Sequence, residues 1–162
     1  MPVLPDPMSA IEVLRRLRRF LLVLTVLLFG GALTELWLVD HTEDPIQWLA
    51  FGFAILGALA ALLVLFRESR ATLLTLRVCM VAVVLGSLFG VYEHVTGNIA
   101  FQREIRPDSS TAKLLSSGLA GGNPLLAPGV LAVAAILGLS ATYRQTGTNE
   151  HQGSLESSQN DL

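Results

Sequence analysis

The sequence is poor in cysteine and in charged residues. Its single cysteine, Cys79, can form no disulfide within the chain, and a cysteine-based metal site would need ligands from another chain. Only 15% of the 162 residues are charged, and the net charge is -2. Because such a chain offers no broad cationic surface and its clustered arginines flank apolar segments instead, we expect no binding to nucleic acid.

Recognisable catalytic motifs are also missing. No grouping of serine, histidine and aspartate, or of cysteine and histidine, occurs in a familiar context, and there is no glycine-rich loop for a phosphate group. His151 lies in a polar C-terminal segment, away from the other histidines in the sequence. The sequence therefore gives no support to an enzymatic function.

Long apolar runs dominate the chain instead. Hydrophobic residues make up 52% of it, the mean hydropathy is +0.58, and the charges lie between the runs, which is outside the usual composition of soluble domains. A helix of about 20 apolar residues crosses the hydrocarbon of a bilayer once. We therefore predict an all-α integral membrane four-helix bundle, in contact with the lipid bilayer, with spans at about 20–39, 46–66, 73–95 and 124–143.

A single transmembrane domain, residues 9–143, is expected between two polar ends. Residues 1–8 are rich in proline, and residues 144–162 are polar and without periodicity, so both segments are predicted to be disordered. A cleavable signal peptide is a competing interpretation of the first span, because arginines precede an apolar run that ends in small residues. The apolar run continues to Val39, however, which favours an uncleaved anchor.

Basic residues are distributed unevenly between the two sides of these spans. On the side of the termini lie Arg15, Arg16, Arg18, Arg19, Arg67, Arg70, Arg77 and Arg144, and on the other side lie Arg103, Arg106 and Lys113. Because arginine and lysine are enriched on the cytoplasmic side of membrane proteins, both termini are predicted to be cytoplasmic. The expected location is the inner membrane of a bacterium, with the turn near residue 41 and the loop of 93–123 in the periplasm.

Small residues recur at helical spacing in the third and fourth spans. Gly86 and Gly90 form a G-x-x-x-G step, and His94 continues the same stripe, so the packed face of this helix leads directly to a polar side chain. His94 is therefore predicted to point toward protein. In the fourth span, Ala134, Gly138 and Thr142 form a comparable close-packing stripe.

Histidine and carboxylate side chains gather at the predicted periplasmic end. Glu35 lies near the edge of the hydrocarbon, where a carboxylate is costly unless it is paired, protonated or facing a wet interior. Glu93 opposes the dipole of its helix and needs a partner such as Arg103 or Arg106, or a bound cation. If the first and third spans meet, the groups available to a divalent metal are His41, His94, Glu35, Glu43, Glu93 and Glu104.

Other interpretations of these residues remain open. The simplest is a structural cap of hydrogen bonds and ion pairs, in which Asp44 caps the second span and Glu43 stands at the positive end of that helix. No pair has the tight spacing of H-E-x-x-H, and a haem between His41 and His94 is disfavoured because both lie at helix ends. Transport by a monomer is disfavoured because four spans leave little room for a pathway and the midplane holds no ionisable residue.

Three sequence patterns together resemble a known group of proteins. They are Glu35-Leu36-x-Leu38-x-x-His41-x-Glu43-Asp44-x-x-Gln47, then Gly90-x-x-x-His94-x-x-x-Asn98-x-x-Phe101-x-x-Glu104, and finally Asn123-Pro124-x-x-Ala127-Pro128-Gly129. These residues resemble a family of small, uncharacterised bacterial four-span inner-membrane proteins. The resemblance implies that His41, Glu43, His94, Asn98 and Glu104 occupy motif positions of that family, and it implies no activity.

Three functional classes follow from these observations. The first is an accessory or structural subunit that packs, through its small-residue stripes, with a membrane-protein partner or a second copy of itself. The second is a metal- or proton-binding membrane protein that uses the periplasmic histidines and carboxylates. The third is a small transporter that works as an oligomer.

Overall fold

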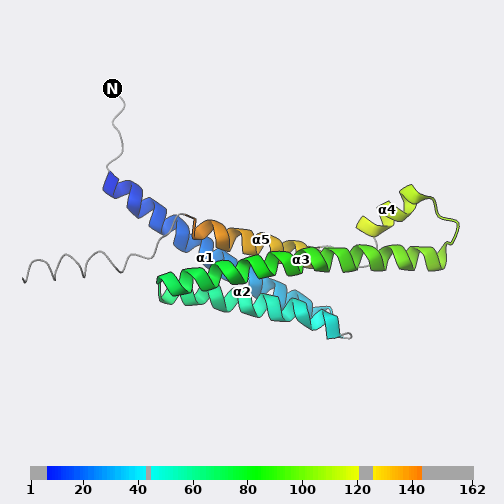
Figure 1. Ribbon diagram of the computed structural model, residues 1–162, viewed down its shortest axis with the longest axis horizontal. Helices are drawn as coiled ribbons and strands as arrows, with labels where there is room; N and C mark the ends of the chain where they lie inside the picture. Colours follow the sequence, from blue (N-terminus) through cyan, green and yellow to red (C-terminus); the bar gives the residue numbers. More distant parts are fainter. Residues whose placement is uncertain (1–6, 43–44, 121–125, 144–162) are drawn as a thin grey trace, which may run out of the picture.

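The computed structural model describes residues 7–42, 45–120 and 126–143, and these residues form helices joined by short turns (Figure 1). The elements are α1 (Pro7–Leu38), the 3-10 turn η1 (Pro45–Gln47), α2 (Trp48–Phe66), α3 (Arg70–Ile105), α4 (Thr111–Ala120) and α5 (Leu126–Ala141). The prediction of an all-α chain is confirmed for this part of the molecule. Helix α1 begins at Pro7, two residues earlier than the sequence predicts, and the rest of the two ends expected to be disordered lies outside the described residues.

Helices α2 and α3 are joined by a tight turn that the sequence encodes locally. Ser69 and Thr72 form a capping box, in which the Ser69 side chain accepts from the Thr72 backbone N–H and the Thr72 side chain accepts from the Ser69 backbone N–H. The Thr72 hydroxyl also donates to the carbonyl of Arg67, the C-cap of α2, at 2.7 Å. One side chain thus ends α2 and begins α3.

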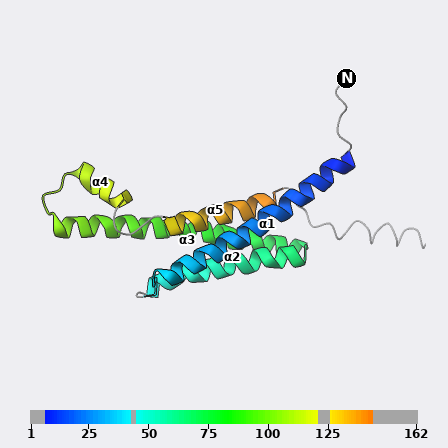
Figure 2. The same ribbon diagram turned by 180° about the vertical axis from the view of Figure 1, so that it is seen from behind.

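Four helices form the bundle, in the cyclic order α1, α2, α3, α5. Helix α2 packs against α1 and α3, and α5 fills the groove between α1 and α3 on the opposite side, as the two views in Figure 1 and Figure 2 show. Consecutive helices run in opposite directions. The bundle therefore has a basic end, defined by Arg18, Arg67 and Arg77, and a histidine end, defined by His41, Pro45–Gln47 and His94.

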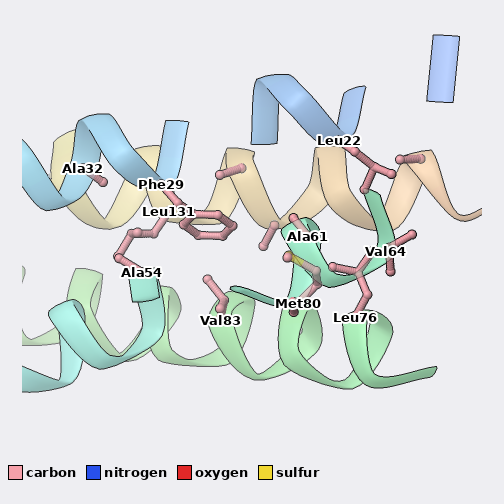
Figure 3. Packing of buried hydrophobic residues seen from close by; sticks show 14 of the residues in the cluster. Leu22, Phe29, Ala32, Ala54, Ala61, Val64, Leu76, Met80, Val83 and Leu131 are labelled. Carbon is pink, nitrogen blue, oxygen red and sulfur yellow. The ribbon is translucent and has the colours of Figure 1, made fainter. Parts of the chain in front are cut away.

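All four helices contribute side chains to the core. In Figure 3 the ring of Phe29 from α1 points toward the centre, with Leu131 of α5 on one side of it and Ala61 of α2 on the other. Phe29 and Ala61 are fully buried, as are Met80 and Val83 of α3. A Cβ atom on Gly57 would meet the Phe29 ring well inside van der Waals contact, so this ring lies directly on the backbone of α2.

Apolar side chains also cover the outside of the bundle. Leu59, Phe66, Leu74 and Leu85, for example, are between 60% and 86% exposed. A surface of this kind is stable only where hydrocarbon or protein covers it. Among the residues that the structure describes, three helices are long and apolar enough to cross a membrane: Ala10–Leu38, Pro45–Phe66 and Arg70–Ile105.

The fourth predicted span is a shorter helix. Helix α5 has 16 residues, about 24 Å at the rise of an α-helix, and its apolar part is Pro128–Ala141. Its predicted packing stripe is nevertheless observed: Ala134 and Thr142 are fully buried, and a Cβ on Gly138 would lie 3.0 Å from the Met80 sulfur.

Arginines close the end of α5. Arg77 of α3 donates to the Thr142 carbonyl oxygen at 2.7 Å, and Arg18 of α1 donates to the Tyr143 carbonyl oxygen at 3.3 Å. Carbonyls in the last turn of a helix have no partner inside that helix, and a cation near them interacts favourably with the helix dipole. Arg77 therefore ties α5 to the basic end, a role that its position near the membrane boundary in the sequence does not reveal.

Helix α3 continues past the apolar run that predicts the third span. The run ends near Val95, but α3 continues to Ile105 and projects beyond the bundle, with α4 folded back against it (Figure 1). Asn98 is 4% exposed and donates to the Gly118 carbonyl oxygen at 3.2 Å, and a Cβ on Gly118 would lie 3.1 Å from Ile99. Helix α3 therefore extends beyond its apolar run, because buried contacts with α4 stabilise its polar C-terminal part.

Candidate functional site

A pocket of about 170 Å³ lies at the histidine end, between α1, α2, α3 and α5. Its walls are mainly apolar and include Leu36, Phe53 and Leu131. The polar side chains in its lining are His41, Gln47, Ser87, Glu93 and His94. The site is therefore an apolar chamber with a few polar groups, the general character of small-molecule sites in proteins.

The end of α1 positions His41 over this pocket. The His41 N–H donates to the Leu36 carbonyl at 3.0 Å and the Asp40 N–H donates to the Trp37 carbonyl at 3.3 Å, which is the hydrogen-bond pattern of a Schellman motif. Asp40 has a φ of 50°, the left-handed conformation that this motif requires after the helix end. Aspartate adopts this conformation more readily than most residues, and the reversal brings His41 back over the last turn of α1.

His94 meets His41 from the other side of the pocket. The two rings stack with their centroids 6.1 Å apart and their planes at 15°. His94 is half-buried on α3, on the face that also carries Gly86 and Gly90, and all three residues line the pocket. The prediction that the glycine stripe directs His94 toward protein is therefore correct, and α1 and α3 do meet through these two histidines.

Both glycines of this stripe make contacts within the chain. A Cβ on Gly86 would meet the ring of Phe53 well inside van der Waals contact, and a Cβ on Gly90 would lie 3.3 Å from Cβ of Pro128. The G-x-x-x-G step thus admits an aromatic ring from α2 and a proline from α5 into the wall of the pocket. These close approaches serve the packing of the bundle itself.

Ser87 is the most unusual polar residue of the pocket. It is 3% exposed, and within the described part of the chain its hydroxyl has no hydrogen-bond partner. Buried hydroxyl groups are usually paired, and a serine within a helix commonly donates to the carbonyl four residues earlier. The wall of the pocket thus contains a buried hydroxyl without a partner among the described residues.

The carboxylates of the predicted metal site do not gather around the two stacked histidines. Glu93 is exposed and lines the pocket, whereas Glu35 is half-buried in the last turn of α1 and outside the lining. Glu104 lies near the far end of α3, about 15 Å along the axis from His94. Glu43 lies outside the described residues, and within those residues no three histidine, cysteine or acidic side chains are grouped closely enough to hold a metal ion.

Comparison with known protein families, characterised proteins and solved structures found no match. The resemblance to small four-span inner-membrane proteins therefore rests on the motif residues alone. Three of those residues have a clear local role in the structure, since His41 and His94 form the stacked pair and Asn98 holds α4 against α3.

Sequence reasoning missed Ser87 and Phe53 as residues of the site. Ser87 lies within the Gly86–Gly90 step, two helical turns before His94 and hence on the same face of α3. That spacing could have identified it. Phe53 gave no comparable signal, because its place in the wall depends on the close approach of α2 to Gly86.

Proposed function

We propose that this chain is a four-span inner-membrane protein of a bacterium, with its basic end in the cytoplasm and its histidine end in the periplasm. The uneven distribution of arginine supports this orientation. The contacts of Arg18 and Arg77 with the end of α5 support the fourth crossing, because they hold that end beside the start of α3. Helix α5 then crosses the membrane packed against the longer helices α1 and α3. The carbonyl groups at its C-terminal end accept hydrogen bonds from arginine in place of water.

The function proposed is the binding of a small ligand in the pocket at the periplasmic end. One observation carries this proposal: His41 and His94, 53 positions apart in the sequence, stack against each other in the lining of an apolar pocket of about 170 Å³. Imidazole can donate or accept a hydrogen bond and can bind a metal. A pair of imidazoles beside an apolar chamber is therefore equipped to orient a small molecule.

A divalent metal is the alternative occupant for the same pair of histidines. His41, His94 and the nearby Glu93 have ligand chemistry that suits a divalent transition metal. The described residues provide no third ligand grouped with the two imidazoles, so a metal would need Glu43 or water to complete its coordination. The geometry consequently favours an organic ligand over a metal centre.

An accessory role is the second candidate function, and the projecting end of α3 favours it. Phe101 and Ile105 of α3 and Leu115 and Leu119 of α4 are each more than half exposed beyond the bundle. Apolar side chains in such a hairpin are suited to contact a membrane protein or a membrane surface. This role would depend on the α3–α4 hairpin, whereas ligand binding would depend on His41 and His94.

We expect the protein purified from its native membranes, without an affinity metal resin, to carry a small organic molecule that is lost from the His41→Ala/His94→Ala double variant. The reason is that the two imidazoles, stacked on each other, are two of the five polar side chains that line the otherwise apolar pocket. Mass spectrometry of an organic extract, elemental analysis and a visible spectrum of the same sample measure the occupant. His151→Ala is the matched control, since it removes the remaining histidine.

Each outcome separates the candidates. A stoichiometric metal that is lost in the double variant would replace the organic ligand with a metal centre. An occupant retained equally in all three proteins, or no occupant in any of them, would contradict binding at the histidine pair. In that case the accessory role would be tested by removing the apolar side chains of the α3–α4 hairpin and examining which membrane proteins co-purify.

A further inference from the structure

The pocket has polar groups at two opposite ends and apolar walls between them. Ser87 and His94 line it from the same face of α3, two turns apart, which separates them by about 10 Å along the helix axis. Because both side chains also take up part of this interval, a ligand that contacts both polar groups must be small and must carry a polar atom at each end.

The volume of the pocket sets the same limit. An apolar protein cavity of about 150 Å³ can bind benzene. The pocket here, at about 170 Å³, therefore has room for one substituted ring and little room for a second fused ring. Phe53 and Phe89 contribute aromatic surface to its lining, against which a flat ring can pack.

Three of the four exposed side chains in the pocket lining are apolar, and Glu93 is the fourth. Ile46, Leu49 and Phe89 line the pocket and are between 43% and 50% exposed, and they belong to elements that form the apolar outer surface of the bundle. In a bilayer, side chains in these positions face hydrocarbon. A ligand would thus enter from the lipid phase, and any apolar tail attached to it could remain there.

We propose that the pocket binds the head group of a monocyclic quinone, in its oxidised or reduced form. This inference rests on the ligand-binding function proposed above and names the class of ligand. One ring oxygen bonds to the buried hydroxyl of Ser87, and the oxygen on the opposite side of the ring faces His94 and His41. Both hydroxyl and imidazole groups can donate or accept, so the same pocket accommodates a quinone, which accepts, and a quinol, which donates.

The unpartnered hydroxyl of Ser87 decides between this ligand and a simple hydrocarbon. A lipid acyl chain or an alkane would leave Ser87 buried without a partner, which costs free energy, whereas a ring oxygen satisfies it. A charged ligand is disfavoured because the surroundings of Ser87 are apolar and contain no ionised side chain of opposite sign in the lining beside it. The site therefore selects an uncharged ligand with oxygen at both ends.

Binding can be followed through Trp48, whose neighbours Gln47 and Leu49 both line the pocket. In a Trp37→Phe background, Trp48 is the only tryptophan. We expect a short-chain benzoquinone, titrated into the protein in lipid nanodiscs, to quench its fluorescence saturably. Ser87→Ala should weaken binding roughly 2- to 10-fold, the loss of one hydrogen bond, and Ser87→Leu should abolish it by filling the pocket. Ser140→Ala, at the basic end, is the matched control and should bind normally.

A second probe separates failure of this inference from failure of the proposed function. Fluorobenzene, followed by its fluorine resonance, should bind the parent protein and Ser87→Ala but not Ser87→Leu, because it needs the cavity and not the hydroxyl. If fluorobenzene binds while the quinone quenches the parent and Ser87→Leu alike, the quinone assignment is overturned and the pocket stands. Quinone binding that is unchanged in Ser87→Ala would also overturn the assignment. If neither probe distinguishes Ser87→Leu from the parent, both proposals fail.

Discussion

Replacing Gly57 by leucine is expected to cost at least about 3 kcal/mol of the free energy of unfolding and to prevent the bundle from closing. The fully buried ring of Phe29 occupies the space into which any side chain at position 57 would extend. Overpacking of a well-packed core forces side chains off their rotamers and shifts the backbone, and Phe29 has no free space to move into. Helix α2 would then be pushed away from α1.

The matched control for this substitution lies on the same helix. A Cβ atom added to Gly52 would have nothing within 4 Å, so Gly52→Leu should leave stability almost unchanged. Unfolding in a titration from mild detergent into sodium dodecyl sulfate, followed by circular dichroism, measures both variants against the parent. Equal stability of the two variants would show that α1 and α2 do not pack with Phe29 on Gly57.

Replacing Arg77 by alanine is expected to cost about 2 to 3 kcal/mol and to release the C-terminal end of α5. The substitution removes a charge-assisted hydrogen bond to the Thr142 carbonyl, and Thr142 is fully buried, so the carbonyl would lose its partner in a place that water reaches poorly. The same detergent titration gives the free energy, and proteolysis after residue 143 gives the release of the helix end.

Arg19→Ala is the control for the arginine substitution. Arg19 also lies at the basic end, but it is exposed on α1, so its loss should change stability by less than about 0.5 kcal/mol. Equal stability of Arg77→Ala and Arg19→Ala would mean that the guanidinium of Arg77 is solvated at the membrane surface. The hydrogen bond from Arg77 would then not be what holds the end of α5 in place.

The sequence carries much of the information about the site, because small residues at helical spacing reveal which face of a helix is packed. The step from Gly86 through Gly90 led to His94, and the stripe of Ala134, Gly138 and Thr142 identified the buried face of α5. These inferences succeed because close helix packing in a membrane requires small side chains at the contact.

Other features depended on contacts that no local pattern specifies. Hydropathy placed the end of the third span near Val95, but α3 continues to Ile105 because α4 packs against it through Asn98 and Gly118. That continuation carries Glu104 away from the histidines, so the set of six metal ligands is not assembled as a group among the described residues. Gly57 is the clearest omission, since its importance arises from a ring on another helix.

The most direct test of the account is whether residues 41 and 94 face each other in the membrane. In a Cys79→Ser background, His41→Cys/His94→Cys should be linked within the chain by a short homobifunctional thiol reagent, and His41→Cys/Glu104→Cys should not, because Glu104 lies about 15 Å further along α3. Labelling with a monofunctional maleimide shows that each thiol is accessible. Thiols at 41 and 94 that label freely but never crosslink would contradict the pocket at the histidine end.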